Sequence, residues 1–210
     1  MSRVDFSLYL ITDRHQTAGR PLLSVLAHAL TAGVKAVQLR EKDLDTRSLI
    51  ELAGKVLSLT RKHGALFFIN DRVDLVMALG ADGVHLRSDS MPIKKARRVL
   101  GPNRLIGASA HSVEDVLKAE TEGADFTVLG PIYHTPSKRL HGDPIGLRAL
   151  EEATQHSHLP IFAIGGISLP RVPEARRAGA HGIALISAIL SAEDVQAATG
   201  FLLHALQTSD

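Results

Sequence analysis

The amino-acid sequence predicts one α/β domain over residues 1–210, folded as a single (β/α)8 TIM barrel. Eight short apolar runs alternate along the chain with longer segments whose apolar residues recur at helical spacing. A chain of 210 residues is long enough, because such barrels need roughly 200 residues or more. An open, doubly wound sheet is the alternative. It is less favoured because no linker rich in proline, glycine or serine divides the chain.

The predicted strands are the eight apolar runs themselves. Each run is too short for a helix, and it is apolar almost without interruption, as expected of parallel strands that are covered on both faces. In chain order these strands are Leu8–Ile11, Ala36–Leu39, Leu66–Ile69, Val84–Leu86, Leu105–Ser109, Phe126–Leu129, Ile161–Ile164 and Ile183–Ile186.

The predicted helices lie between these runs and place apolar residues three and four positions apart, as Leu22, Val25 and Leu26 do. In chain order they are Leu22–Ala32, Thr46–His63, Arg72–Leu79, Pro92–Leu100, Val113–Glu122, Gly146–Gln155, Leu169–Ala178 and Ala192–Leu206. We expect the side chain of Asp71 to cap the short helix over Arg72–Leu79, because aspartate is a favoured residue at that position.

Four glycines mark the ends of alternate helices: Gly33, Gly80, Gly123 and Gly179. Glycine adopts the left-handed conformation that commonly terminates a helix, and the next apolar run follows within a few residues in each case. Because the even-numbered strands share this entrance, the pattern favours a doubled βαβα unit.

Composition excludes several classes of function. The 24 basic and 22 acidic residues leave a formal net charge of +2 without a basic stripe, so we expect no nucleic-acid partner. The sequence has no cysteine, which excludes disulfides, thiolate metal sites and cysteine nucleophiles. No apolar run approaches the roughly 18 residues of a membrane span, and the N-terminus lacks a signal peptide. We expect a cytoplasmic protein with no membrane partner; self-association into a homo-oligomer is left open.

Polar side chains gather where the predicted strands end. In a (β/α)8 barrel the carboxyl ends of all strands meet on one face, which carries the functional site. The residues at these ends are Thr12, Asp13, Arg14, Gln38, Arg40, Glu41, Lys42, Asn70, Asp71, His85, Arg87, Ser88, Asp89, Ser109, His111, Gly130, Thr135, Ser137, Lys138, Gly165, Gly166 and Ser187.

This set has the chemistry of an anion site. Arg40, Lys42 and Lys138 are cations able to hold phosphate oxygens. The glycine pair at 165–166 and the serine at 187 follow the seventh and eighth strands, where barrels commonly bind phosphate. Taken singly, each motif has an ordinary structural explanation, such as a solvated charge run or a turn. Together on one rim they favour a site for a diphosphate or for two phosphates.

This rim also carries candidate metal ligands and candidate acid–base residues. Asp71 is a candidate ligand for Mg²⁺, which binds one or two carboxylates together with phosphate oxygens. A zinc hydrolase is disfavoured because the sequence has neither cysteine nor an HExxH motif, although His85, His111 and His134 leave it open in principle. A single histidine such as His111 is more often structural than catalytic.

Over nearly its whole length the chain resembles the family that contains thiamine phosphate synthase and the TenI-type thiazole tautomerase. The resemblance is carried, in family order, by LYLITDR (8–14), VQLREK (37–42), FINDRVDL (68–75), DGVHL (82–86), GASAHS (107–112), GADFTVLGPIYHTPSK (123–138), AIGGI (163–167) and GIALISAI (182–189). This combination is specific for the superfamily and much less so for the branch within it.

The resemblance implies a magnesium-assisted transferase that joins a hydroxymethylpyrimidine diphosphate to a thiazole phosphate, giving thiamine phosphate and pyrophosphate. It implies pyrimidine diphosphate contacts for Gln38, Arg40, Lys42, Asn70, Ser109 and Lys138, and thiazole-side contacts for Thr135 and Ser137. It implies a thiazole phosphate cradle at Gly165, Gly166, Ile186 and Ser187, and Mg²⁺ binding by Asp71. The residues expected to act in catalysis are Arg40, Lys42, Ser109, Lys138 and His111.

The sequence departs from the synthase pattern at three positions. The second metal aspartate of the family is replaced by Ser90, and Asp89 stands one residue earlier. Arg87 stands where the family usually has a small glycine, and Arg171 stands where it often has asparagine. Because the change falls in a loop, we expect Asp89 to reach Mg²⁺ in place of the missing aspartate, with Asp71 as the other anchor.

Two other functions remain open. A tautomerase of the TenI type would use His111 as acid and base without a metal, and a non-catalytic regulator would only bind thiazole phosphate. The complete QLREK, ND and TPSK motifs favour the synthase, because a diphosphate substrate requires them.

Overall fold

The computed structural model describes residues 4–135 and 143–208. Within them, eight parallel strands close into a barrel in which each strand pairs with the next and β8 pairs with β1. The strands are β1 (Leu8–Ile11), β2 (Ala36–Leu39), β3 (Leu66–Asn70), β4 (Gly83–Leu86), β5 (Leu105–Ala110), β6 (Phe126–Leu129), β7 (Ile161–Ala163) and β8 (Gly182–Leu185). The predicted (β/α)8 barrel is confirmed, and every strand boundary agrees with its prediction to within one residue.

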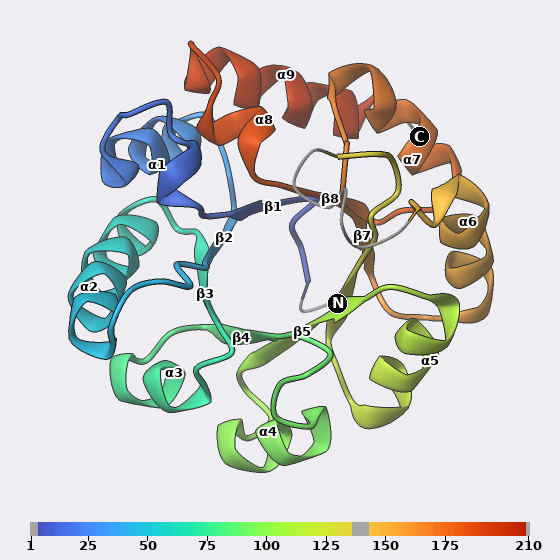
Figure 1. The fold of residues 1–210 in the computed structure, drawn as a ribbon, viewed down its shortest axis with the longest axis horizontal. Coiled ribbons are helices and arrows are strands. Elements are labelled where there is room, and N and C mark those ends of the chain that lie inside the picture. The colour runs from blue at the N-terminus through green and yellow to red at the C-terminus, as the bar shows by residue number, and fades with distance from the viewer. Residues whose placement is uncertain (1–3, 136–142, 209–210) are drawn as a thin grey trace.

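The helices form a ring around this barrel (Figure 1). They are α1 (Leu22–Thr31), α2 (Thr46–Lys62), α3 (Val73–Leu79), α4 (Ile93–Leu100), α5 (Val113–Glu122), α6 (Gly146–His156), α7 (Val172–Arg177), α8 (Ser187–Leu190) and α9 (Val195–Gln207), with short 3-10 turns η1 (Arg14–Gln16) and η3 (Leu169–Arg171). In the described residues, no helix is long and apolar enough to cross a membrane.

Three helix predictions need correction. The segment Leu169–Ala178 is a 3-10 turn followed by α7 and not one helix, because Pro170 and Pro173 each remove a backbone N–H. The segment Ala192–Leu206 begins later, at α9, where the side chain of Asp194 accepts a hydrogen bond from the backbone N–H of Ala197. Asp71 does not cap α3, whose N-cap is Arg72 without a side-chain cap bond.

The prediction that four glycines end helices in the left-handed conformation is confirmed. Gly33, Gly80, Gly123 and Gly179 have φ angles of 113°, 69°, 92° and 87°, in the left-handed region that glycine enters without steric cost. Each therefore ends a helix and turns the chain into an even-numbered strand, as the repeat predicted.

Aromatic side chains fill the barrel interior below the site. Phe6 precedes β1, and its ring centroid lies 5.0 Å from that of Phe162 and 5.6 Å from that of Phe126. Room for the rings comes from glycines on neighbouring strands. A Cβ on Gly83 would lie 2.6 Å from the ring of Phe68, and one on Gly107 would lie 2.4 Å from the ring of Phe126.

Candidate active site

A cavity of about 690 Å³ opens at the carboxyl ends of the strands. It is lined by Ile11, Gln38, Arg40, Lys42, Asn70, His85, Arg87, Ser88, Asp89, Ser109, His111, Val128, Pro131, Asp143, Ile145, Ile164 and Ile186. Most of the predicted site residues therefore meet in one place. Ser137 and Lys138 lie outside the described residues, and the roles assigned to all of these side chains stay predictions.

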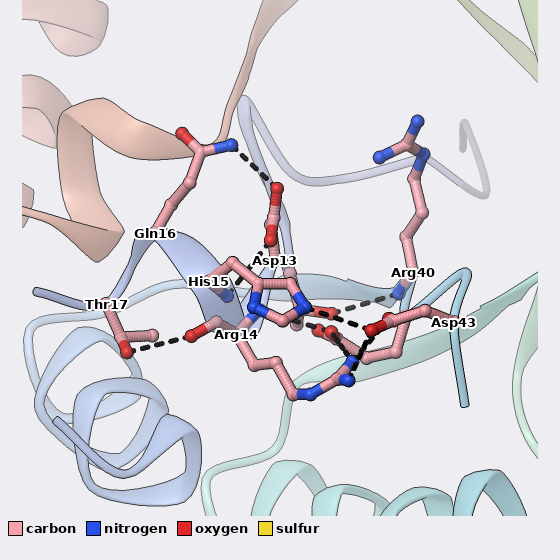
Figure 2. A network of polar contacts seen from close by, with 9 residues as sticks. Asp13, Arg14, His15, Gln16, Thr17, Arg40 and Asp43 are labelled. Carbon is pink, nitrogen blue, oxygen red and sulfur yellow. Dashed lines mark hydrogen bonds and ion pairs between the residues drawn. The ribbon is translucent and has the colours of Figure 1, made fainter. Parts of the chain in front are cut away.

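The loop after β2 carries two cations, and the loop after β1 fixes its backbone. Thr12 Oγ1 accepts a hydrogen bond from the backbone N–H of Arg40 at 2.9 Å. The Arg14 guanidinium donates to the buried Glu41 carboxylate at 3.1 Å and to Asp43 at 2.5 Å. Figure 2 shows the Arg40 side chain directed away from this network. The acidic residues of the loop are thus held by Arg14, while Arg40 and Lys42 line the cavity.

Three cationic side chains, Arg40, Lys42 and Arg87, line the cavity. Burial lowers the pKa of Arg40. The charge of Arg87 adds to the lowering, while the carboxylates of Asp13, Glu41 and Asp71 oppose it. The pKa of Lys42 is lowered first by the charge of Arg40, and then by burial and by Arg87. In the described part of the chain, neither the Arg40 nor the Lys42 side chain donates a hydrogen bond to a protein acceptor. An anionic ligand would relieve this repulsion, since each cation favours its charged form near a negative group.

Polar side chains from β2 and β3 form a chain along the cavity wall. Gln38 Nε2 donates to Asn70 Oδ1 at 3.1 Å, and Asn70 Nδ2 donates to Asp71 Oδ2 at 3.1 Å. Because each amide is oriented by the next residue, these side chains are held in fixed positions before a ligand arrives.

His85 on β4 and Ser109 on β5 form a pair at the cavity floor. His85 Nε2 lies 3.0 Å from Ser109 Oγ, and the imidazole is buried. Burial lowers the pKa of His85 to about 3; Arg40 adds to the lowering and Asp71 opposes it. The ring is therefore neutral near pH 7. From the sequence, His85 was considered only as a rim residue and a possible zinc ligand. Alternation along β4 places it on the same face as Gly83, inside the barrel.

His111 follows β5 and lies at the edge of the cavity. Its Nδ1 is 2.6 Å from the carbonyl oxygen of Gly130. A carbonyl only accepts hydrogen bonds, so Nδ1 carries the proton, and in a neutral ring Nε2 then has a free lone pair. The residue thus has the tautomer that a general base requires.

The carboxylate of Asp71 is fully occupied by protein donors. Oδ1 accepts from Ser90 Oγ and, at 3.3 Å, from the backbone N–H of Arg87. Oδ2 accepts from Arg87 Nε at 2.6 Å and from Asn70 Nδ2 at 3.1 Å. A carboxylate has about four acceptor positions, and all are filled.

This arrangement does not fit a divalent cation. Asp89 is exposed, and its Oδ1 lies 3.3 Å from Arg87 Nη2, so the arginine stands between the two aspartates that were predicted to hold Mg²⁺. In the parts of the chain that are described, no group of three or more histidine, aspartate or glutamate side chains is placed to hold a metal ion. Magnesium and its predicted ligands Asp71 and Asp89 stay a prediction.

The loop after β7 contains the predicted phosphate cradle. Gly165 and Gly166 have φ angles of 93° and 65°. A Cβ on Gly165 would lie 2.5 Å from Pro131 Cβ, and one on Gly166 would lie 2.7 Å from the carbonyl oxygen of His134. Glycine is required at both positions because the loop after β6 packs directly on this turn. Ser187 begins α8 beside it.

Arg171 supports the same turn. Its Nη1 donates to the carbonyl oxygen of Gly166 at 2.6 Å, and its guanidinium lies 4.2 Å from the centroid of the Tyr133 ring. The Tyr133 hydroxyl in turn donates to Glu174 Oε2 at 2.5 Å. The arginine that departs from the family pattern therefore connects the loops after β6 and β7. Thr135, predicted to contact the thiazole, is half-buried in the first of these loops.

Fold and cavity together define the class of protein: a (β/α)8 barrel with cationic side chains lining a cavity at the carboxyl ends of its strands. The family model described as thiamine monophosphate synthase matches residues 8–189, and the chain belongs to this family. The predicted family is thereby confirmed.

Relatives and a solved structure cover nearly the whole chain. A putative thiamine-phosphate synthase from Geobacter sulfurreducens is 54% identical over 92% of this chain and 91% of its own length. A thiamine-phosphate synthase from Chloroflexus aurantiacus is 45% identical over 93% and 90%. A thiamine phosphate pyrophosphorylase structure from Pyrococcus furiosus superposes with a TM-score of 0.88 at 39% identity, covering 97% of this chain and 96% of that one.

Proposed function

We propose that the protein is a thiamine phosphate synthase, a transferase that condenses 4-amino-2-methyl-5-(diphosphooxymethyl)pyrimidine with a thiazole phosphate. The products are thiamine phosphate and pyrophosphate. The observation that carries the proposal is the pair of cations Arg40 and Lys42, which face one cavity without protein acceptors among the described residues. The names of the relatives support the same reaction. A cytoplasmic location and self-association stay predictions.

The cavity has the size and lining for both substrates. Its volume of about 690 Å³ lies within the range of roughly 300–1,000 Å³ typical of ligand pockets. In this proposal the diphosphate binds at Arg40 and Lys42, which line the cavity. The thiazole phosphate binds at the turn of Gly165 and Gly166 with Ser187, three residues that are not among those lining the cavity. Apolar side chains such as Ile11 and Val128 also line the cavity and suit the faces of the two rings.

The chemistry follows from this arrangement. The bond between the pyrimidine methylene carbon and the diphosphate oxygen breaks, and the electron pair leaves with pyrophosphate. Fixed cations stabilise the charge that develops on the leaving group. The thiazole nitrogen then donates its lone pair to the methylene carbon. Holding both rings in one cavity supplies proximity, so no side-chain nucleophile is needed.

One observation favours a second candidate, thiazole tautomerisation. His111 lines the cavity, and its hydrogen bond to Gly130 leaves Nε2 able to take a proton from a bound thiazole phosphate carboxylate. This reaction needs no diphosphate, so it leaves the unpartnered cations Arg40 and Lys42 without a role. The synthase accounts for more of the site.

Pyrophosphate release tests the proposal. The full chain, given both substrates in Mg²⁺ and separately in EDTA, should form thiamine phosphate and pyrophosphate in equal amounts in at least one condition. Proton exchange on the thiazole carboxylate is measured beside it. If no pyrophosphate forms in either condition, while proton exchange proceeds and is lost in His111→Ala, the tautomerase replaces the synthase.

A further inference from the structure

Asp71 lies in a strained turn. Its φ angle of 60° is in the left-handed region, which is uncommon for residues other than glycine. The turn is fixed by two backbone bonds: Asp71 N–H donates to the His85 carbonyl at 2.9 Å, and Arg72 N–H donates to the Asn70 carbonyl at 2.7 Å. Strained residues cluster at functional sites, and here the strain sets the position of a carboxylate beside the cavity.

That carboxylate holds an arginine in place. Arg87 follows β4, and it meets Asp71 through both its backbone N–H and its Nε, the latter at 2.6 Å. Ser90 Oγ accepts from the same backbone N–H at 2.9 Å and donates to Asp71, so the turn after β4 is closed around the carboxylate. Asp89 contacts the far side of the guanidinium at 3.3 Å.

The Arg87 guanidinium still has N–H groups that bind neither aspartate. It carries five N–H groups, of which one binds Asp71 and one faces Asp89, so three remain. Arg87 lines the cavity with Arg40 and Lys42, and its charge lowers the pKa of both of them. The three cations therefore act on the same space, and Arg87 is the only one of them that has carboxylate partners in the described residues.

We infer that Arg87 binds the diphosphate directly, as a fixed cation in the place where Asp71 would otherwise hold a divalent metal. The inference rests on the proposed function. When the carbon–oxygen bond breaks and its electron pair passes to pyrophosphate, the three remaining N–H groups donate to phosphate oxygens. No proton is transferred, and Asp71 and Asp89 keep the guanidinium oriented. A planar guanidinium suits two phosphate oxygens at once.

Binding of inorganic pyrophosphate to the full chain, measured by calorimetry, tests this without turnover. The wild type should bind in EDTA, with less than a threefold change when Mg²⁺ is added. Arg87→Ala and Arg87→Gln should each lose at least tenfold in EDTA; the glutamine variant keeps a neutral donor beside Asp71 to protect folding. Arg98→Ala removes an exposed arginine on α4 and should match the wild type.

Titration with Mn²⁺ alone gives the second readout. Freed from Arg87, the Asp71 carboxylate should bind the metal at least tenfold more tightly in Arg87→Ala than in the wild type. Pyrophosphate binding by the wild type only in the presence of metal, or unchanged binding by both Arg87 variants in EDTA, overturns the inference. Failure of the synthase is seen separately, as absence of pyrophosphate formation by the wild type in either condition.

Discussion

The buried His85 predicts a specific dependence of stability on pH. Its pKa falls from the ordinary 6.5 to about 3 in the folded protein, mainly by burial. Below pH 6.5 the unfolded chain takes up a proton that the folded chain excludes, so stability is present above 6.5 and lost as the pH falls toward 3. Each pH unit corresponds to about 1.4 kcal/mol, so His85 alone should cost about 2 kcal/mol of unfolding free energy between pH 6.5 and pH 5.

Urea denaturation of the wild type and His85→Gln at pH 7 and pH 5 isolates this effect. Glutamine does not titrate and can still reach Ser109, whose Oγ lies 3.0 Å from the histidine. Other groups, including the partly buried His181, titrate alike in both proteins and cancel in the difference. Between pH 7 and pH 5 the unfolding free energy of the variant should therefore fall by about 2 kcal/mol less than that of the wild type. Equal losses would show that His85 is protonated in the folded protein, and the reasoning would fail.

Three further predictions concern the rim of the barrel. Arg40→Ala should reduce kcat/KM for the pyrimidine diphosphate by about 2–4 kcal/mol of transition-state stabilisation, with a smaller effect on thiazole phosphate binding; equal losses for the two would contradict the assignment. Gly166→Asp should weaken thiazole phosphate binding in calorimetry, since its Cβ would meet the carbonyl of His134 at 2.7 Å; a folded variant with unchanged affinity would refute it. Thr12→Val removes the acceptor for the Arg40 backbone N–H, so it should lower kcat while leaving the melting temperature within a few degrees; an unchanged kcat would mean that the loop is held by Arg14 alone.

The strands could be predicted because strands that are buried on both faces consist of short, continuous runs of apolar residues. β6, for example, begins and ends where its run does, at Phe126 and Leu129. Helix boundaries were less accurate where local backbone chemistry competes with periodicity. The apolar period continues through 169–178, but two prolines within it divide the segment into η3 and α7.

The sequence predicted which residues lie at the carboxyl ends of the strands, but it did not predict which of their side chains contact one another. Strand order places Arg40, Asn70 and Ser109 on one rim, since all carboxyl ends of a barrel share a face. Pairing of Asp71 with Arg87 depends instead on the turn after β4, in which Ser90 N–H donates to the Arg87 carbonyl at 3.1 Å. A side-chain pair set by the shape of one turn leaves no periodic signal, so the ion pair between Asp71 and Arg87 could not be predicted from the sequence.

The distribution of acidic partners explains how three cations share one cavity. Arg14 binds the carboxylates of Glu41 and Asp43, and neither carboxylate forms an ion pair with Arg40 or Lys42 in the described residues. Of the three cations, Arg87 alone forms ion pairs with carboxylates among the described residues. Two cations are left with mutual repulsion, which the lowered pKa of Lys42 reports. Repulsion of this kind disfavours the empty site, and the diphosphate proposed to bind there would relieve it. Part of the expected affinity for that anion would then come from the repulsion between cations in the free protein.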